Sequence, residues 1–345
     1  MKTEDISILI IYTGGTIGMI TDHITGALLP FRVENILEEL PELRKFGYNL
    51  TTHSFNPPID SSNVNPEVWK EIASVIETNY EKYDGFIILH GTDTMAYSAS
   101  AISFMLENLQ KPVIFTGSQL PLGTLRTDGR DNLIAAIEIA AARRGKYPAV
   151  PEVGIYFENK LFRGNRTSKY NVEAFKAFQS YNYPPLVESG VHIRYNTPAI
   201  RKAPNRKNKL IVHKNLDDNL VVLKLFPGIN KKTIQAIFNI PGLKAVIIET
   251  FGAGNAMEEK WFINEVKNAI DRNIILLNVT QCAQGSVELG LYETSIELAR
   301  CGVVSGYDIT TEAAVTKLMF LLGMGIDKEK IILNLNKSIS GEITI

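Results

Sequence analysis

Short apolar runs alternate with longer amphipathic stretches through the first part of this chain. The apolar runs have the length of buried strands and lie at Ile6–Tyr12, Leu50–Phe55, Gly85–His90 and Pro112–Thr116. Apolar residues at helical spacing lie between and after them, at Val33–Leu43, Pro66–Tyr83, Thr94–Leu109 and Asp128–Arg144. Strand, loop and helix repeated in this order predict parallel βαβ units, with helices covering both faces of one sheet.

This pattern is interrupted between Tyr181 and Lys209 and then begins again. The interruption is rich in proline and polar residues and shows no long period. After it we expect strands at Leu220–Leu225, Lys244–Glu249 and Asn273–Val279, and helices at Lys231–Phe238, Glu258–Arg272 and Thr310–Gly323. The length of 345 residues also exceeds what one hydrophobic core usually holds. We therefore predict an α/β protein with a larger N-terminal domain on a mainly parallel, doubly wound sheet (1–190), a linker (191–212) and a smaller C-terminal α/β domain (213–345).

Charge and hydropathy exclude several classes of protein. Basic and acidic residues number 36 and 37, a net charge of -1, whereas nucleic-acid-binding domains usually carry a basic excess. The densest basic run spans 201–209 and is broken by proline and asparagine, so we interpret it as a solvated loop rather than a binding patch. No apolar stretch has the length of a membrane span, and the N-terminus lacks a signal-peptide core. We expect a cytoplasmic protein with no nucleic-acid or membrane partner.

The cysteines and histidines argue against a disulfide framework and against a metal site. Cys282 and Cys301 are too few for a framework and fit a reducing compartment, and we expect them to be buried rather than nucleophilic. The five histidines are scattered, without H-E-x-x-H or Cys–His spacing. His90 ends a predicted strand, where it either touches a site or is a hydrogen-bonded core histidine. We expect no metal.

Small polar residues follow four successive predicted strands. The segments are YTGGTIGM, NPPIDSSN, HGTDTMAYSAS and TGSQLP. Taken singly, Thr16, Thr92 and Asp93 read as helix caps, Gly14-Gly15 as a tight turn and Asp60–Ser62 as an Asx turn. However, the carboxyl ends of parallel strands form the ligand-binding edge of such sheets. The recurrence of these residues at that edge favours an active site.

These motifs resemble those of a known family. TGGTIG near the N-terminus and HGTDTMAYSAS around residue 90 together are similar to the double signature of bacterial-type L-asparaginases. The resemblance covers nearly the whole chain and extends to GSQLPLGTLRTDGRDNL, FRGNRTSK, FPGI, TFGAGNA, TQCAQGSV and TTEAAVTKL, which look like the cytoplasmic, type I branch. It implies a hydrolase of linear amides that converts L-asparagine to L-aspartate and ammonia without a cofactor. It also implies self-association as a dimer or tetramer.

The resemblance further implies roles for individual residues. Thr16 matches the first nucleophilic threonine of the family, and Thr92, Asp93 and Lys169 match its Thr-Asp-Lys set. The implied substrate-binding residues include Asp60 and Ser61, which would hold the α-amino and α-carboxylate groups, Ser118, whose backbone carbonyl would receive the leaving amide, and Gly15 and Gly91.

The chemistry that these residues must perform is difficult, because an amide is a poor electrophile and a threonine hydroxyl a weak nucleophile. Such catalysis needs a base and oxyanion donors. A lysine can act as the base when burial or a neighbouring cation lowers its pKa. We expect Lys169 and Thr92 to relay the proton, Asp93 to support them and contact the substrate ammonium, and Thr16 to be acylated. Backbone N–H groups near Gly15 and Thr92 are the expected oxyanion donors.

Two features depart from the family pattern. The segment Thr21–Pro30, expected to be a closing lid, lacks the tyrosine that family members often carry there, and Tyr292 of a neighbouring subunit could supply a hydroxyl instead. Some type I enzymes are activated by asparagine through an arginine on the strand before the TFGAGNA-like loop. This chain has Glu249 there, so we predict no such activation.

Other functions stay open on sequence alone. The enzyme could accept glutamine as well as asparagine, because one methylene changes binding by only about 1–3 kcal/mol. An amidotransferase subunit on the same scaffold has an extra N-terminal domain, for which a first strand at about Ile6 leaves no room. A catalytically silent amino-acid-binding protein is disfavoured by the joint presence of Thr16, Thr92, Asp93 and Lys169.

Overall fold

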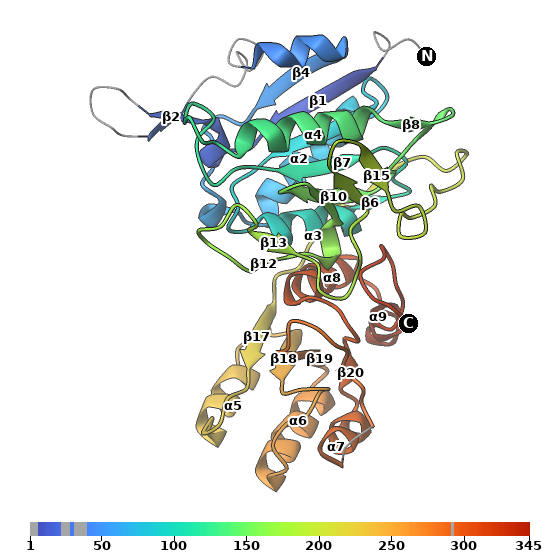
Figure 1. Ribbon diagram of the computed structural model, residues 1–345. Helices are drawn as coiled ribbons and strands as arrows, with labels where there is room; N and C mark the ends of the chain where they lie inside the picture. The colour runs from blue at the N-terminus through green and yellow to red at the C-terminus, as the bar shows by residue number, and fades with distance from the viewer. Residues whose placement is uncertain (1–5, 22–27, 31–39, 291–292) are drawn as a thin grey trace. The chain divides into compact units, whose positions relative to one another are not determined.

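The computed structural model describes residues 6–21, 28–30, 40–290 and 293–345 (Figure 1). The chain divides into two compact units, Met1–Lys214 and Asn215–Ile345. Two short strands lie within the stretch 191–212 that composition suggests as a linker. They are β15 (Ile193–Tyr195) and β16 (Ile211–Val212), which pair with other strands of the N-terminal unit. The boundaries at 190 and 212 stay a prediction.

An eight-stranded sheet, ordered β15-β14-β11-β10-β7-β5-β1-β4, forms the centre of the N-terminal unit. The parallel neighbours are β4 (Asn49–Ser54), β1 (Ser7–Tyr12), β5 (Gly85–Leu89), β7 (Val113–Thr116) and β10 (Val153–Phe157). The antiparallel strands at one edge are β11 (Lys160–Arg163), β14 (Val187–Ser189) and β15. The predicted, mainly parallel sheet is therefore confirmed.

Helices pack on both faces of this sheet. Side chains of α4 (Gly129–Ala141) share one core with Ile8, Ile10 and Ile87. Successive side chains of a strand point to opposite faces, so Phe86 lies on the other face, where it stacks on Tyr80. Tyr80 directly follows α2 (Pro66–Asn79), and α2 packs against α3 (Met95–Met105). This is the doubly wound arrangement that the sequence pattern predicts.

Local chemistry explains where the helix α2 begins. Asn65 caps it, because its Oδ1 accepts hydrogen bonds from the backbone N–H groups of Glu67 and Val68. Pro66 occupies the first helical position, where its missing N–H is not needed. Both features match the sequence prediction. The helix ends earlier than expected, at Asn79, and the N–H groups of Tyr80 and Lys82 then bond to the carbonyls three residues before them, Glu77 and Asn79, in a tighter turn.

Short elements complete the N-terminal unit. Hairpins and isolated pairs are β2 (Met19–Thr21) with β3 (Leu28–Pro30), β8 (Arg143–Arg144) with β9 (Tyr147–Pro148), β12 (Ser168–Lys169) with β13 (Phe178–Gln179), and β6 (Leu106–Glu107) with β16. The 3-10 turns are η2 (Thr16–Gly18), η4 (Pro41–Phe46), η5 (Ser61–Asn63) and η6 (Gly164–Arg166). The helix expected at Val33–Leu43 lies largely outside the described residues.

The C-terminal unit has a parallel four-stranded sheet of its own, ordered β17-β18-β19-β20. Its strands are β17 (Leu220–Lys224), β18 (Ala245–Thr250), β19 (Ile275–Thr280) and β20 (Val304–Ser305). Its helices are α5 (Lys231–Phe238), α6 (Lys260–Asp271), α7 (Glu293–Cys301), α8 (Thr311–Gly323) and α9 (Lys328–Leu335). The smaller α/β domain predicted for this half is present.

Two observations concern expectations about cysteine and membranes. Cys282 is exposed and Cys301 is partly exposed, so the prediction that both are buried is wrong. Cys282 lies in the loop directly after β19, where its backbone N–H bonds to the Thr280 hydroxyl and its side chain is left at the surface. No helix in the described part of the chain is long and apolar enough to span a membrane.

Candidate active site

The strand order of the large sheet reverses direction between β1 and β5. After β1 the chain passes to β4 on one side, and after β4 it crosses to β5 on the other side of β1. The loops after β1 and β5 therefore leave the sheet on either side of a topological switch point, which is where open α/β sheets bind ligands. Thr16 belongs to the first of these loops and Thr92 to the second.

Glycines let the backbones of three loops come into contact at this point. A Cβ atom on Gly15 would lie 2.5 Å from the Cα and N of Gly91, and a Cβ on Gly14 would lie 2.0 Å from the carbonyl oxygen of Ile59. Gly14 and Gly15 also have positive φ values of 141° and 89°, which side chains rarely tolerate. The tight turn suggested by the sequence is thus also the place where the loops after β1, β4 and β5 meet.

Hydrogen bonds fix the turn that carries Thr16. The hydroxyl of Tyr12 donates to the carbonyl of Gly18, at 3.3 Å, from a buried position that raises the pKa of Tyr12 to about 12. Thr13 donates its backbone N–H and its hydroxyl to Leu89, each at 3.0 Å, which joins the ends of β1 and β5. Thr16 itself is the first residue of η2 and is partly exposed.

Lys169 brings together two residues of the loop after β5. Its Nζ donates to the Oγ1 of Thr92 at 2.8 Å and to the Oδ1 of Asp93 at 2.7 Å. The side chain of Lys169 is 14% exposed, whereas that of Asp93 is 63% exposed. Lys169 stands on β12, so a strand far along the chain places a cation on the threonine hydroxyl. The contact leaves the hydroxyl hydrogen of Thr92 available to another acceptor.

The loop after β4 supplies Asp60 and Ser61. Asp60 is exposed, and its Oδ1 accepts from the backbone N–H and the hydroxyl of Ser62, both at 2.9 Å. These two hydrogen bonds lower the pKa of Asp60 below its ordinary value. Ser61 is buried, and its Oγ would be 2.5 Å from a Cβ on Gly91. An ionised carboxylate and a serine thus lie in the loop that meets Gly14 and Gly91.

Thr94 is a contributor that the sequence pattern predicts only as a helix start. Its hydroxyl donates to the carbonyl of Ser61 at 2.7 Å, which ties the loop after β4 to the loop after β5. Its place in the segment HGTDT, two residues after Thr92, is the signal that could have drawn attention to it.

Ser118 is buried in the loop directly after β7, the neighbour of β5 in the sheet. The loop after Ser118 is fixed by Asp128, whose carboxylate accepts hydrogen bonds from the backbone N–H groups of Gln119 and Leu120. The hydroxyl of Ser118 is itself buried and has no hydrogen-bond partner within the described part of the chain. A buried hydroxyl without a partner costs about 1–3 kcal/mol, so a bound molecule would satisfy it.

Two alternatives were open for His90, and the structure supports the second: it is a hydrogen-bonded histidine of the core. Its Nδ1 lies 2.7 Å from the carbonyl of Gly91, an acceptor, so Nδ1 carries the proton. Its Nε2 then accepts from the hydroxyl of Ser98 at 2.9 Å, and Ser98 accepts from the Trp69 indole at 2.9 Å. Burial lowers the pKa of His90 to about 4, which keeps the ring neutral. The chain of hydrogen bonds ends on the peptide that links Gly91 to Thr92.

Comparison with known proteins identifies the family. Residues 7–201 match the family model described as asparaginase, N-terminal, and residues 219–332 match the one described as glutaminase/asparaginase C-terminal domain.

The chain belongs to the asparaginase family.

Full-length relatives agree with this assignment. The chain is 45% identical over 340 residues to L-asparaginase 1 of Escherichia coli (strain K12), and the match covers 98% of each protein. The crystal structure of L-asparaginase I from Vibrio cholerae is similar with a TM-score of 0.88 at 40% identity, covering 98% of this chain and 99% of the other. The thermostable L-asparaginase from Thermococcus kodakarensis is similar with a TM-score of 0.87 at 31% identity, with the same coverage. The resemblance stated from the motifs is therefore confirmed.

Some predicted positions of this asparaginase-family chain lie outside the described residues or in the C-terminal unit. Tyr292 and most of the lid, 22–27, lie outside the described residues, although β2 and β3 pair on either side of that lid segment. Glu249 stands at the end of β18 in the C-terminal unit, and its Oε1 accepts from the Thr311 hydroxyl at 2.7 Å. Among the described residues there is no cluster of three or more His, Cys, Asp or Glu that could hold a metal.

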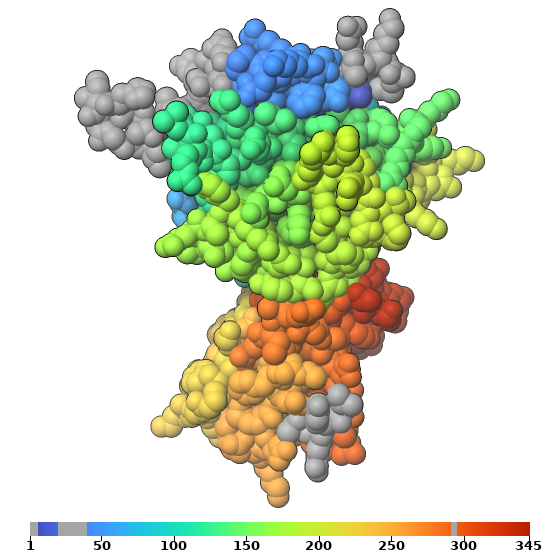
Figure 2. Space-filling view, in the orientation of Figure 1, coloured from blue at the N-terminus to red at the C-terminus, as the bar shows by residue number. Residues whose placement is uncertain are grey.

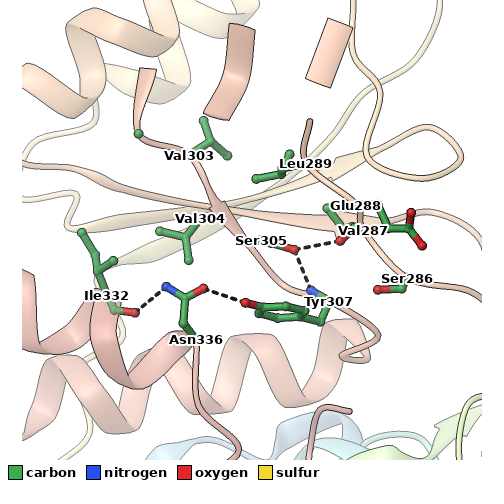
Figure 3. A pocket seen from close by; sticks show the side chains of 11 residues that line it. Ser286, Val287, Glu288, Leu289, Val303, Val304, Ser305, Tyr307, Ile332 and Asn336 are labelled. Atoms are coloured by element: carbon green, nitrogen blue, oxygen red, sulfur yellow. Dashed lines mark hydrogen bonds between the residues drawn. The ribbon is translucent and has the colours of Figure 1, made fainter. Parts of the chain in front are cut away.

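A hollow of about 510 Å³ in the C-terminal unit is lined by the residues that precede Tyr292, from Ser286 to Leu289 (Figure 3). Three of its polar side chains, Ser305, Tyr307 and Asn336, bond to one another or to the backbone. Tyr307 donates to Asn336 at 3.3 Å, Asn336 donates to the carbonyl of Ile332 at 3.0 Å, and Ser305 donates to the carbonyl of Val287 at 2.9 Å. We assign no chemistry to this hollow.

Proposed function

We propose that this chain is an L-asparaginase, which hydrolyses L-asparagine to L-aspartate and ammonia through an acyl-enzyme on Thr16. The observation that carries the proposal is the ammonium of Lys169 lying 2.8 Å from Thr92 Oγ1 and 2.7 Å from Asp93 Oδ1. The same loop touches the Thr16 loop through Gly15 and Gly91. A hydroxyl, a lysine and a carboxylate beside a second hydroxyl form the set that threonine-based amide hydrolysis requires.

The first half of the reaction forms the acyl-enzyme. Lys169 first releases one ammonium proton to bulk water and becomes the neutral amine. The Oγ1 of Thr16 then attacks the side-chain carbonyl carbon of asparagine, and its proton passes through the Thr92 hydroxyl to the Nζ of Lys169. The C–N bond then breaks. The leaving nitrogen takes the proton from Lys169 by the same path and departs as ammonia. This use of one relay as base and then as acid is general acid–base catalysis.

The second half returns the enzyme to its starting state. Water attacks the acyl carbon and gives one proton to the relay, the ester bond to Thr16 breaks, and the threonine oxygen recovers its proton. Aspartate leaves. In both steps a negative charge develops on the carbonyl oxygen, and backbone N–H groups near Gly15 and Thr92 stabilise it by hydrogen bonding. The hydrogen bond from His90 to the Gly91 carbonyl holds the Gly91–Thr92 peptide in a fixed orientation, as oxyanion donors require.

Charge pairing supports an amino-acid substrate. A free amino acid presents an ammonium and a carboxylate. Asp93 is exposed beside Lys169, and hydrogen bonds hold the pKa of Asp60 low, so both carboxyl groups offer negative charge to the ammonium. Ser61 and neighbouring N–H groups hold the substrate carboxylate. The buried hydroxyl of Ser118 lacks a partner among the described residues, and we assign the carbonyl of the same residue to the leaving amide.

Self-association as a dimer or tetramer, with Tyr292 of a neighbouring subunit reaching the site, and a cytoplasmic location also belong to this proposal. Sedimentation of the purified chain tests the first and cell fractionation tests the second. If Tyr292→Phe leaves turnover unchanged, the role given to that hydroxyl is wrong.

Ammonia release from L-asparagine by the purified full-length chain tests the activity, with Thr16→Ala as the control. Release by the wild type and none by the variant supports an enzyme, whereas no release by either indicates an amino-acid-binding protein. Glutamine and D-asparagine in the same assay define the substrate range. Mass spectrometry of the enzyme quenched during turnover locates the acyl group, and its presence on Thr92 instead of Thr16 would overturn the assignment of the nucleophile.

A further inference from the structure

A hollow of about 650 Å³ lies at the amino-terminal edge of the large sheet, away from Thr16 and Thr92. Its wall includes Asp84, directly before β5, and Lys111, two residues before β7. The rest comes from the β8–β9 hairpin and from the loop 203–206. Figure 1 shows this hairpin and the yellow loop side by side, and they project together in Figure 2. The candidate active site is at the carboxyl ends of the same strands, so the hollow is a separate feature.

Four cationic side chains from three segments face this hollow. They are Lys111, Arg143, Lys146 and Arg206, and the carboxylate in the wall is Asp84. The chain as a whole carries a net charge of -1, so this is a local excess of positive charge. A volume of several hundred Å³ lies in the range of pockets that hold small molecules.

Arg143 has a buried nitrogen whose hydrogen-bonding capacity is unused. Its Nη1 donates to the carbonyls of Ala140 and Ala142, at 3.0 and 3.1 Å. Its Nη2 lies 3.1 Å from the Oδ1 of Asp84 but is not aligned for a hydrogen bond to it, and no other acceptor among the described residues bonds to it. A buried guanidinium nitrogen in this state is suited to an incoming acceptor.

Lys111 is held by neutral groups. Its Nζ donates to the carbonyls of Tyr80 and Tyr83 and lies 4.6 Å from the centre of the Tyr80 ring. Burial is the main effect on the pKa of Lys111 and lowers it; Glu81 and Asp84 act in the opposite direction, and Arg143 lowers it further. An anion in the hollow would favour the charged form of Lys111, since an opposite charge nearby stabilises an ammonium.

The loop that closes the hollow is fixed in place. Arg206 donates from Nη2 to the carbonyl of Lys146 at 3.0 Å, and its guanidinium lies 3.9 Å from the centre of the Tyr147 ring. Gln110 donates to the carbonyl of Asn208 at 2.7 Å. The basic side chains of the run 201–209 are all exposed, as expected for a solvated loop. Arg206 lines the hollow, whereas Lys207 is exposed outside it.

We propose that this hollow binds an oxyanion of the phosphate class with at least two phosphoryl groups. In a hollow of about 650 Å³, a chain of phosphoryl groups can reach Lys111, the hairpin and the loop 203–206 at once. It would supply an acceptor for Nη2 of Arg143 and a counter-charge for Lys111. Arginine and lysine are the side chains that proteins use for such groups.

Calorimetric titration of inorganic tripolyphosphate into the full-length protein at low ionic strength tests this site. The double variant Lys146→Gln/Arg206→Gln removes two exposed cations of the hollow. The matched control, Lys207→Gln/Lys209→Gln, removes the same charge from exposed positions of the same loop outside it. We expect saturable binding by the wild type and the control, and about tenfold or greater weakening in the first variant, as for the loss of charged hydrogen bonds.

Equal weakening in the two double variants would show a nonspecific attraction to the basic loop and overturn the proposal, as would a wild type without saturable binding. Orthophosphate that binds as tightly as tripolyphosphate would also overturn it. Adenosine triphosphate separates two sources of the same chemistry. If adenosine triphosphate binds with the same affinity as tripolyphosphate, the hollow recognises only the phosphoryl chain. If it binds more tightly, the hollow also recognises the nucleoside, and the ligand is a nucleotide. Both double variants should retain asparagine hydrolysis, so failure here is distinct from failure of the proposed function.

Discussion

A Cβ atom on Gly15 would lie 2.5 Å from the Cα of Gly91. Real Cβ contacts are not that short, and the atoms that a Cβ on Gly15 would meet belong to the backbone, so an alanine at position 15 must separate the two loops. A Cβ on Gly91 would instead lie 2.5 Å from the Oγ of Ser61 and displace that substrate-binding side chain. We expect Gly15→Ala and Gly91→Ala each to lower kcat/KM by at least about 100-fold, because a displacement of about 1 Å in a site can cost that much. Steady-state ammonia release measures it. A Cβ on Gly190 meets only one atom, at 4.0 Å, so Gly190→Ala is the control and should retain full activity.

The contact of Lys169 with Thr92 predicts a loss of turnover without a matching loss of fold. Lys169→Met removes the proton relay, and we expect kcat to fall by about 10² to 10⁴, the usual contribution of general acid–base catalysis. Lys176→Met is the control, since Lys176 is exposed between β12 and β13. Thermal unfolding of both variants checks the fold. A Lys169→Met enzyme with normal kcat would contradict the relay.

His90 predicts a pH dependence of stability. Its folded pKa is about 4, below the ordinary value of 6.5. As the pH falls from about 6.5 towards 4, the unfolded chain binds a proton on this ring that the folded chain does not, so stability falls over that window. The full effect is about 3 kcal/mol. Urea unfolding from pH 7 to 4 should show a steeper loss for the wild type than for His90→Gln; parallel curves would refute this account.

Lys317 and Glu342 form an ion pair inside the C-terminal unit, with Nζ and Oε1 2.7 Å apart and both side chains 0% exposed. Glu342 also accepts from the N–H groups of Ile339 and Ser340. Lys317→Met would leave the carboxylate buried without its cation, and we expect a loss of about 3–5 kcal/mol in unfolding free energy. Adding Glu342→Gln should recover part of it in urea titrations. Additive losses would mean that the pair is not coupled.

The acid at position 249 predicts how the rate of hydrolysis depends on asparagine concentration. An acid at this position would repel the carboxylate of an asparagine effector, and the Thr311 hydroxyl and Lys224, 3.7 Å away, already engage its two oxygens. We expect a hyperbolic dependence of rate on asparagine concentration. A sigmoidal curve, measured over a wide concentration range, would contradict this prediction.

Local sequence patterns were enough to predict most helices and strands and the positions of the polar loops. Strand and helix periodicity is a local property, and so are the Asn65-Pro66 helix start and the glycine turn after β1. The order of elements then led to a doubly wound sheet, and polar segments after successive strands pointed to one edge of it. The TGGTIG and HGTDTMAYSAS motifs are enough to indicate the family.

Which residues meet depends on how the strands are ordered and packed. Lys169 is 76 residues from Asp93 along the chain, and no local pattern places its Nζ between Thr92 and Asp93. The strand order β5-β1-β4 brought the Gly14-Gly15 turn against the loops after β4 and β5. Likewise, Arg206 joined Arg143 and Lys111 around a hollow only because its loop folds back onto the β8–β9 hairpin. Periodicity depends on near neighbours in sequence, whereas such convergence depends on strand order and packing between segments far apart.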